Sequence, residues 1–137
     1  MNSESRVGNL YEKIASAALD EAVGIQLAHL TGDESFSFFG AEIAPRKKIA
    51  AHYHRNGLEI YQVVQGDGIM YIGNRDDHGG IVWNQPFQIG RGDCFTVQAG
   101  EAHQLYNTAD HPMVVVFGCS KTHLAGDRYV VEGFNRI

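Results

Sequence analysis

Residues 46–66 of the 137-residue chain read RKKIAAHYHRNGLEIYQVVQG, a stretch in which two histidines and one glutamate stand close together. His52 and His54 are two positions apart, and alternate residues of a β-strand point to the same face of the sheet. The dipeptide Asn56-Gly57 favours a tight reversal of the chain, so Glu59 is predicted to open an adjacent antiparallel strand. Glu59 would then face the same interior as the two histidines. The stretch therefore predicts two strands that bring three potential metal ligands together.

A second stretch, residues 92–107, reads GDCFTVQAGEAHQLYN and carries one further histidine, His103. Imidazole and carboxylate ligands together suit Fe, Mn, Co, Ni, Cu or Zn far better than Ca or Mg. The histidine pair and the glutamate have no cysteine near them, which argues against a structural zinc knot. The pattern indicates one divalent transition metal held by three nitrogens and one oxygen, with open positions for a substrate. The identity of the metal stays open.

The first stretch resembles the first sequence motif of the cupin superfamily. That motif has the form G-x5-H-x-H-x3-4-E-x6-G, and its later positions are matched in register by four residues of this chain: His52, His54, Glu59 and Gly66. Arg46 stands where the leading glycine usually falls.

The second stretch resembles the second cupin motif, which has the form G-x5-P-x-G-x2-H-x3-N. Gly92, Gly100, His103 and Asn107 match this motif in register, whereas Gln98 replaces its proline. The replacement is expected to loosen the turn before the second glycine and to leave the metal ligands intact. Asn107 is expected to act as a hydrogen-bond anchor rather than as a catalytic group.

The resemblance implies an all-β fold, a single antiparallel β-barrel of the jelly-roll type with the metal inside it. It also implies that His52, His54, Glu59 and His103 are the metal ligands. Cupins include dioxygenases, isomerases, decarboxylases, lyases and non-catalytic binding proteins, so the fold does not decide the activity. The leading expectation is a metal-dependent dioxygenase, an oxidoreductase that acts on a small organic molecule. The alternatives are a non-oxidative cupin enzyme or a binding module for a sugar or an organic acid.

Outside the motifs, the chain divides into a short helical part and a long β part. Apolar residues recur every four positions from Leu10 to Ala22, which predicts one amphipathic helix that ends at Gly24. Residues 1–24 are therefore interpreted as a helical extension packed on the barrel, and residues 25–137 as the barrel itself. Runs rich in Val, Ile, Phe and Tyr predict strands at 25–30, 36–43, 48–54, 59–64, 68–73, 82–89, 94–97, 102–106, 113–119 and 129–131.

Tyr61 and Val63 have the same strand parity as Glu59, so both side chains are predicted to line the cavity. A phenol beside the metal can orient a substrate or transfer a proton, which makes Tyr61 the candidate catalytic residue. The remaining histidines lack paired spacing and are expected to be surface or hydrogen-bonded residues rather than ligands: His29, His78, His111 and His123.

The composition limits the partners of the protein. A net charge of -5 argues against a nucleic-acid partner, and no apolar run is long enough to cross a bilayer. Two cysteines and a start without the features of a secretion signal favour a cytoplasmic location. A homodimer is expected, because Phe36, Phe38 and Phe39 offer an apolar face. The alternation at 36–38 predicts that Phe36 and Phe38 point inward and that Phe39 points outward.

Overall fold

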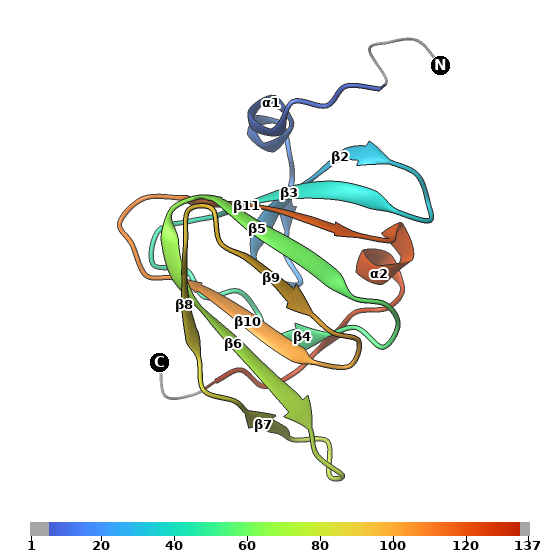
Figure 1. Ribbon diagram of the computed structural model, residues 1–137, viewed down its shortest axis with the longest axis vertical. Coiled ribbons are helices and arrows are strands. Elements are labelled where there is room, and N and C mark those ends of the chain that lie inside the picture. The colour runs from blue at the N-terminus through green and yellow to red at the C-terminus, as the bar shows by residue number, and fades with distance from the viewer. Residues whose placement is uncertain (1–5, 135–137) are drawn as a thin grey trace.

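Residues 6–134 are described by the computed structural model and form two facing antiparallel sheets (Figure 1). The first sheet has the strand order β1-β2-β3-β11-β5-β9, and the second has the order β12-β4-β10-β6-β7 with β8 paired to β6. The prediction of an all-β jelly-roll barrel is therefore confirmed. The elements, in chain order, are α1 (Leu10–Ala15), β1 (Leu19–Asp20), β2 (Ile25–Gly32), β3 (Ser37–Ile43), β4 (His52–Tyr53), β5 (Glu59–Gln65), β6 (Asp67–Arg75), β7 (Ile81–Trp83), β8 (Phe87–Gly90), β9 (Cys94–Val97), β10 (Ala102–Asn107), β11 (Met113–Cys119), α2 (Lys121–Ala125) and β12 (Tyr129–Val130).

The core lies between the two sheets and follows the two-residue alternation of the strands. In β5, Glu59, Tyr61 and Val63 are buried, whereas Ile60 and Gln62 are exposed. Alternate side chains of a strand point to opposite faces, so the buried set shares the inner face of the first sheet. The predicted inward parity of Tyr61 and Val63 is confirmed, but only Tyr61 of the two lines the cavity beside the site, whereas Val63 packs in the core.

The prediction that Glu59 opens a strand adjacent to the His52 strand is wrong. β4 pairs with β10 and β12 in the second sheet, and β5 pairs with β11 and β9 in the first. Both edges of β4 are therefore occupied and cannot receive β5. The Asn56-Gly57 turn, with Gly57 at a φ of 77°, instead carries the chain from one sheet to the other. The histidine pair and Glu59 consequently face each other across the core.

The N-terminal helix is shorter than the sequence predicted. The Asn9 side chain caps its start by accepting the backbone N–H groups of Tyr11 and Glu12, both at 3.1 Å. The helix ends at Ala15 rather than at Gly24, because the chain then extends to form β1, which pairs with β2. Residues 1–5 of the predicted extension lie outside the described residues. Neither helix in the described part of the chain has the length and apolarity needed to cross a membrane.

The helix α1 packs on the outer face of the first sheet, where Ile14 meets Ala28 and Val114 (Figure 1). Gly40 in β3 permits this approach. A Cβ atom at Gly40 would lie 2.4 Å from the Leu10 side chain, which is well inside van der Waals contact. The N-terminal part of the chain therefore joins the barrel through both a helix and a strand.

Three further differences from the predicted elements have local causes. The predicted strand 82–89 is divided into β7 and β8, because Pro86 cannot donate to a strand ladder. The predicted strand 48–54 is reduced to β4, and Lys48 makes an isolated bridge with Tyr106. The short helix α2 was not predicted, because five residues are too few to show helical periodicity.

The predicted parity of the phenylalanines in residues 36–39 is wrong. Phe36 and Phe38 are 58% and 41% exposed, whereas Phe39 is 5% exposed and stacks on Phe117 in the core. The β3 ladder fixes this parity, because Ser37 and Phe39 fall on the inner face of the first sheet. The exposed apolar face is therefore made by Phe36 and Phe38.

Candidate metal centre

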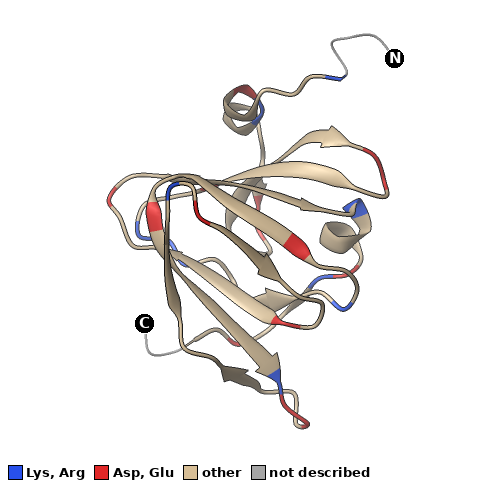
Figure 2. Ribbon diagram, viewed as in Figure 1, with Lys and Arg blue, Asp and Glu red and all other residues tan. Residues whose placement is uncertain are grey.

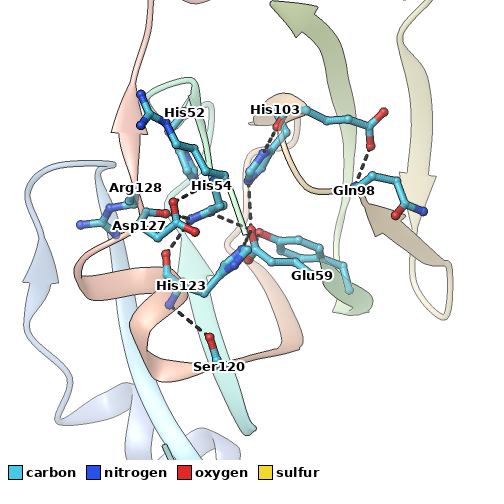
Figure 3. Close-up of polar contacts among 12 residues, drawn as sticks. His52, His54, Glu59, Gln98, His103, Ser120, His123, Asp127 and Arg128 are labelled. Carbon is cyan, nitrogen blue, oxygen red and sulfur yellow. Dashed lines mark hydrogen bonds and ion pairs between the residues drawn. The ribbon is translucent and has the colours of Figure 1, made fainter. Parts of the chain in front are cut away.

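Two sheets bring the four sequence-predicted ligands to one point in the core (Figure 3). His52 lies in β4, directly opposite His103 of β10 in the same ladder, and His54 follows β4. Glu59 begins β5 on the facing sheet. One potential ligand atom from each of these side chains lies within 4.8 Å of all the others, and all four residues are buried. The arrangement of four donors around one centre is thus present in the fold.

The three histidine rings are oriented by hydrogen bonds on their Nδ1 atoms. His52 Nδ1 donates to the carbonyl oxygen of Ala50 at 2.9 Å. His54 Nδ1 approaches the carbonyl oxygens of His123 and Asp127, both at 2.6 Å. His103 Nδ1 makes a longer contact of 3.4 Å with the carbonyl oxygen of Glu101. A proton held on Nδ1 leaves Nε2 with a free lone pair, the state that a metal-binding imidazole requires.

Buried polar atoms at the centre lack hydrogen-bond partners. His54 Nε2 lies 2.9 Å and His103 Nε2 3.3 Å from Glu59 Oε1, but neither contact has the direction of a hydrogen bond. An unsatisfied buried polar group costs about 1–3 kcal/mol, and more if it is charged. A cation between these atoms would satisfy all of them together. The donor set of imidazole nitrogens and one carboxylate therefore fits a divalent transition metal.

The protonation states of His52 and Glu59 are those that a metal site requires. Burial and the neighbouring His103 hold the pKa of His52 well below its usual value, so its imidazole is neutral. Burial alone would raise the pKa of Glu59, but the close approach of His103, His123 and His54 outweighs it and holds that pKa well below the usual range. A neutral imidazole and an ionised carboxylate are the forms that bind metal ions.

The carboxylate of Glu59 is exceptional in its position. Figure 2 shows Lys, Arg, Asp and Glu mostly in turns and near the ends of strands. Among the described residues, Glu59 is the one acidic side chain that is buried, at 1% exposed. Burial of an ionised carboxylate is strongly unfavourable unless nearby groups compensate its charge. The groups around Glu59 therefore have to compensate its charge.

Tyr61 supports the second oxygen of this carboxylate. Its hydroxyl donates to Glu59 Oε2 at 2.9 Å, and the side chain is buried. Burial and the adjacent Glu59 raise the pKa of Tyr61 well above its usual value, so the phenol stays protonated and continues to donate. The candidate catalytic residue is thus positioned beside the site, and its hydroxyl contacts a candidate ligand.

His123 is the site residue that sequence reasoning missed. It was expected to be a surface or hydrogen-bonded histidine rather than a ligand. It is hydrogen-bonded through Nδ1, but it is buried, at 3% exposed, and its Nε2 lies 3.2 Å from Glu59 Oε1. Its ring stacks on that of His54 with 3.6 Å between centroids, and its Nδ1 contacts the carbonyl oxygen of Asn56 at 2.9 Å. No local spacing marks His123 as a site residue, because the turn of helix α2 brings it to the centre from far along the chain.

The segment that follows α2 also fixes the loop between the histidine pair and Glu59. The Asp127 carboxylate accepts the backbone N–H of Arg55 at 2.8 Å and that of Asn56 at 2.7 Å. These bonds close the loop at its beginning, while His123 contacts the Asn56 carbonyl from the other side. The positions of His54 and Glu59 therefore depend on residues 120–128.

A largely apolar cavity adjoins the cluster. The space inside it that a water-sized molecule can reach is about 30 Å³, enough for a few water molecules. Arg128 is the one cationic side chain in its lining, and it is paired with Asp20 at 2.7 Å. The lining residues are Val23, Ile25, Leu27, Ala41, Ile43, Ile49, His52, Glu59, Tyr61, Met70, Leu105, Val115, Phe117, Leu124 and Arg128.

The two departures from the cupin motifs have local structural counterparts. Arg46, at the position of the usual glycine, adopts a glycine-like φ of 62° and forms an ion pair with Asp110 at 2.8 Å. The Gln98 backbone N–H, which a proline would lack, donates to Glu101 Oε1 at 2.7 Å. The expected loosening of this turn is therefore offset by a bond that the motif residue could not make. Asn107 is a hydrogen-bond anchor as expected, since its amide contacts the carbonyls of residues 43, 44 and 111.

Known proteins resemble this chain in sequence and in fold. The oxalate-binding protein of Thermotoga maritima is 27% identical over 92 residues, which cover 63% of this chain and 67% of that protein. An uncharacterized conserved protein with a double-stranded beta-helix domain from Klebsiella pneumoniae subsp. pneumoniae matches with a TM-score of 0.69 at 17% identity, over 94% of this chain and 99% of that chain. Oxalate decarboxylase of Bacillus subtilis, in a structure concerned with its Mn(II) centres, matches with a TM-score of 0.65 at 18% identity. The match covers 89% of this chain but 31% of the decarboxylase chain, and at this identity it shows the fold alone.

The family model described as Cupin domain matches residues 40–119, which include all four candidate ligands. This match covers more than half of the chain, and the two sheets and the four-residue cluster agree with it. The chain belongs to the cupin domain family.

Proposed function

We propose that this protein is a metal-dependent cupin that binds a small organic acid or a related chelating molecule at a metal held by His52, His54, Glu59 and His103. The observation that carries the proposal is the group of buried donor atoms without hydrogen-bond partners at the edge of a cavity. A relative named as an oxalate-binding protein and a structural neighbour named as oxalate decarboxylase support a ligand of this class. We therefore favour ligand binding or a non-oxidative reaction over oxygenation.

The residues around such a site would have different roles. A divalent transition metal, when bound, supplies a Lewis acid that polarises a carboxylate or a carbonyl group. The histidines and Glu59 would hold that metal, and the largely apolar walls would limit the water around it. Tyr61 fixes the Glu59 carboxylate through Oε2 and stands at the cavity wall, where its phenol can orient a bound molecule.

The cavity favours a ligand with one polar end. Apart from the cluster and Tyr61, its lining is apolar, and the charge of Arg128 is already matched by Asp20. A free carboxylate against Ile43 or Phe117 would lose its hydration without gaining a partner, which is costly. We therefore favour a molecule with a chelating carboxylate or 2-oxo acid group and a compact apolar body over a bare dicarboxylate such as oxalate.

Oxygenation of a small organic molecule is the second candidate. The feature that favours it is the combination of histidine and carboxylate donors with an apolar cavity beside them, since such donors with open positions also serve non-haem iron oxygenases. Oxygen uptake distinguishes this chemistry from the non-oxidative alternatives.

The metal proposal predicts that His52→Ala and His103→Ala lose most of the bound metal while the barrel still folds. Each change removes one ligand, so the affinity for the metal should fall by more than the roughly 10–100-fold that is typical when a residue hydrogen-bonded to a ligand is changed. Metal present at about 100 times its Kd adds about 2.7 kcal/mol to the stability of the folded state, so chelation should lower the Tm of wild type and not that of the variants. Elemental analysis and thermal melts measure both effects.

His78→Ala is the matched control, because His78 is an exposed histidine on the tip between β6 and β7. It should keep the metal content and the melting behaviour of wild type. Equal metal content in wild type, His52→Ala and His103→Ala would refute the assignment of the site.

The ligand proposal predicts a preference for 2-oxo acids with short apolar side chains over oxalate. The preference is expected because an apolar side chain gains about 25 cal/mol for each Å² that it buries. Calorimetry on the Mn(II)-loaded protein with 2-oxobutanoate, 4-methyl-2-oxopentanoate, benzoylformate and oxalate measures it. Product analysis for released CO2, with an oxygen electrode in parallel on the Mn(II)- and Fe(II)-loaded forms, tests for turnover. Oxalate binding tighter than every 2-oxo acid would contradict the preference, and oxygen uptake coupled to product would favour the dioxygenase.

The proposed role of Tyr61 predicts that Tyr61→Phe keeps the fold and the metal content at saturating metal but weakens function. The change removes a hydrogen bond to a carboxylate, an interaction worth about 1.5–3 kcal/mol. In an enzyme we expect kcat to fall, and in a binder we expect ligand affinity to fall. Tyr106→Phe, a half-buried tyrosine outside the cavity lining, is the control. If Tyr61→Phe kept the turnover and the ligand affinity of wild type, the proposed role of the Tyr61 hydroxyl would be wrong, and Tyr61 would serve only in packing.

We also propose a homodimer formed through the outer face of the first sheet. Phe38 and Ile60 lie on the two strands that flank Gly118 in the ladder, and the Phe36 ring lies over Gly118. All three side chains are exposed, at 58% for Phe36, 41% for Phe38 and 51% for Ile60. Contiguous exposed apolar side chains of this kind mark association surfaces.

The dimer proposal predicts a species of twice 15.1 kDa in sedimentation equilibrium at micromolar concentration. Phe38→Ser combined with Ile60→Ser should shift it to the monomer, because the change removes the apolar surface without touching the core. Val82→Ser, which alters an exposed apolar residue of the other sheet, should leave the mass unchanged. A wild-type protein that sediments as a monomer would disprove the proposal.

A further inference from the structure

We propose that organic acid anions enter the protein at a surface depression lined by Lys47 and Lys48, and that residues 20–24 form a gate between this depression and the metal centre. The ion pair between Asp20 and Arg128 holds this gate segment closed. The inference rests on the proposed function and deepens it, because it names the route by which the ligand reaches the site and the residues that control that route.

A ligand needs a movement of the cavity wall to reach the metal centre. His52 is the most exposed of the four candidate ligands, and it is only 5% exposed. The adjoining cavity has about 30 Å³ within reach of a water-sized molecule, which is enough for a few water molecules. A 2-oxo acid such as 4-methyl-2-oxopentanoate needs more room than that. Part of the wall therefore opens when such a molecule enters.

The wall is thin at the gate segment. Val23 and Ile49 line the cavity on one side and the surface depression on the other. Both residues are apolar and buried, so a single layer of side chains separates the two spaces. The depression is lined by Glu21, Ala22, Val23, Gly24, Lys47, Lys48, Ile49, Ala50 and Gln104. An outward movement of Val23 would join the depression to the cavity.

The gate segment forms a turn that is closed on itself. The Gly24 N–H donates to the Asp20 carbonyl oxygen at 2.7 Å, and Gly24 has a φ of 85°, a left-handed conformation that favours glycine. The strand before the turn, β1, is two residues long and pairs with β2. In the described part of the chain, the turn is otherwise held by a bond of 2.9 Å from the Ala50 N–H to the Val23 carbonyl oxygen and by the ion pair with Arg128. The turn can therefore move as a unit when these two contacts break.

The ion pair between Asp20 and Arg128 is the main restraint on the gate segment. Arg128 Nη1 donates to Asp20 Oδ2 at 2.7 Å, and Nη2 donates to Oδ1 at 3.2 Å, so the pair is bidentate. The two side chains are 17% and 16% exposed, so water and salt screen the pair less than they screen an exposed pair. Arg128 follows helix α2 and lines the cavity, whereas Asp20 ends β1. The pair thus joins the N-terminal and C-terminal segments beside the cavity.

The depression outside the gate has the charge that attracts an organic acid anion. Lys47 and Lys48 form no ion pair with a described residue, whereas the adjacent Arg46 is paired with Asp110. Glu21 is the one acidic residue of the lining, so two lysines against one glutamate leave a net positive charge. A local positive charge raises the concentration of anions near it. These lysines therefore attract the ligand to the outer side of the gate.

An exchange of carboxylates on Arg128 couples the arrival of the ligand to the opening of the gate. A guanidinium pairs with the carboxylate of a ligand in the same bidentate way as with that of Asp20, because the groups are chemically the same. A ligand that takes the place of Asp20 releases the gate segment. A neutral molecule has no group that competes with Asp20, so it leaves the gate closed. The gate therefore favours organic acid anions over uncharged molecules of similar shape.

Hydrogen exchange measures the gate without a metal or a ligand. The Ala50 amide is protected by its bond to the Val23 carbonyl oxygen, so its exchange rate, followed by NMR, reports opening of the gate segment. Asp20→Asn and Arg128→Gln each remove the ion pair and should speed this exchange about 5-fold or more. Glu34→Gln removes an exposed ion pair on another loop and should leave the rate unchanged. The exchange of a core amide in β11 separates local opening from global unfolding.

Stopped-flow mixing of the Co(II)-loaded protein with 4-methyl-2-oxopentanoate measures entry, because a ligand on Co(II) changes its visible absorption. In wild type the observed rate should level off as the concentration of the acid rises, since opening of the gate becomes limiting. Asp20→Asn should raise this plateau about 5-fold. Lys47→Gln combined with Lys48→Gln should lower the rate at low acid concentration about 3-fold in low salt. Lys13→Gln combined with Arg91→Gln makes the same change of net charge at exposed positions elsewhere and should leave the rate unchanged.

The methyl ester of the same acid tests the exchange of carboxylates on Arg128. The ester has nearly the same shape and no charge, so it should gain more than the acid does when Asp20→Asn opens the gate. An equal gain for the ester and the acid would overturn the exchange step.

Wild-type exchange of the Ala50 amide in both Asp20→Asn and Arg128→Gln would overturn the gate. An entry rate that does not change in the double variant of Lys47 and Lys48 would overturn the entry site. If Co(II)-loaded wild type bound neither a 2-oxo acid nor oxalate, the proposed function would be wrong, and the entry route with it. The exchange rates need no metal and no ligand, so the two failures are distinguishable.

Discussion

The ionised carboxylate of Glu59, buried between two apolar sheets, is the constraint on which the rest of the site depends. A charge in such a place is tolerated only when dipoles or opposite charges surround it. Tyr61 satisfies one carboxylate oxygen, and three imidazole nitrogens gather around the other without hydrogen-bonding to it. The incomplete satisfaction of that second oxygen is the physical reason to expect a cation there.

This requirement also explains how the two sheets are joined near the site. Glu59 projects from β5 in one sheet, whereas His52 and His103 project from β4 and β10 in the other. β4 is only two residues long, and its ladder alone would hold it weakly. The Asp127 carboxylate therefore fixes the loop after His54, so that the segment after α2 completes a site whose candidate ligands come from both sheets.

The sequence predicted those features that follow from local geometry. The alternation of a strand placed Tyr61 beside Glu59, and the motif spacing identified four residues that the fold brings together. It did not predict that Glu59 lies on the opposite sheet, because the pairing of β4 with β10 and β12 is decided by segments far away in the chain. His123 was missed for the same reason. The end of α1 was misplaced because alanines at helical spacing bury little surface, so strand pairing with β2 decided the conformation.

Several of the groups that distinguish this site lie outside residues 40–119, the part that matches the family model. His123 and Asp127 come from the C-terminal segment, and part of the cavity wall comes from Val23, Ile25 and Leu27. The motif residues supply the candidate metal ligands, but they do not determine the shape or polarity of the space beside them. Relatives that share the motifs can therefore differ in their ligands. The chemistry of this protein is accordingly better inferred from the segments that close the barrel than from the motif that places it in its family.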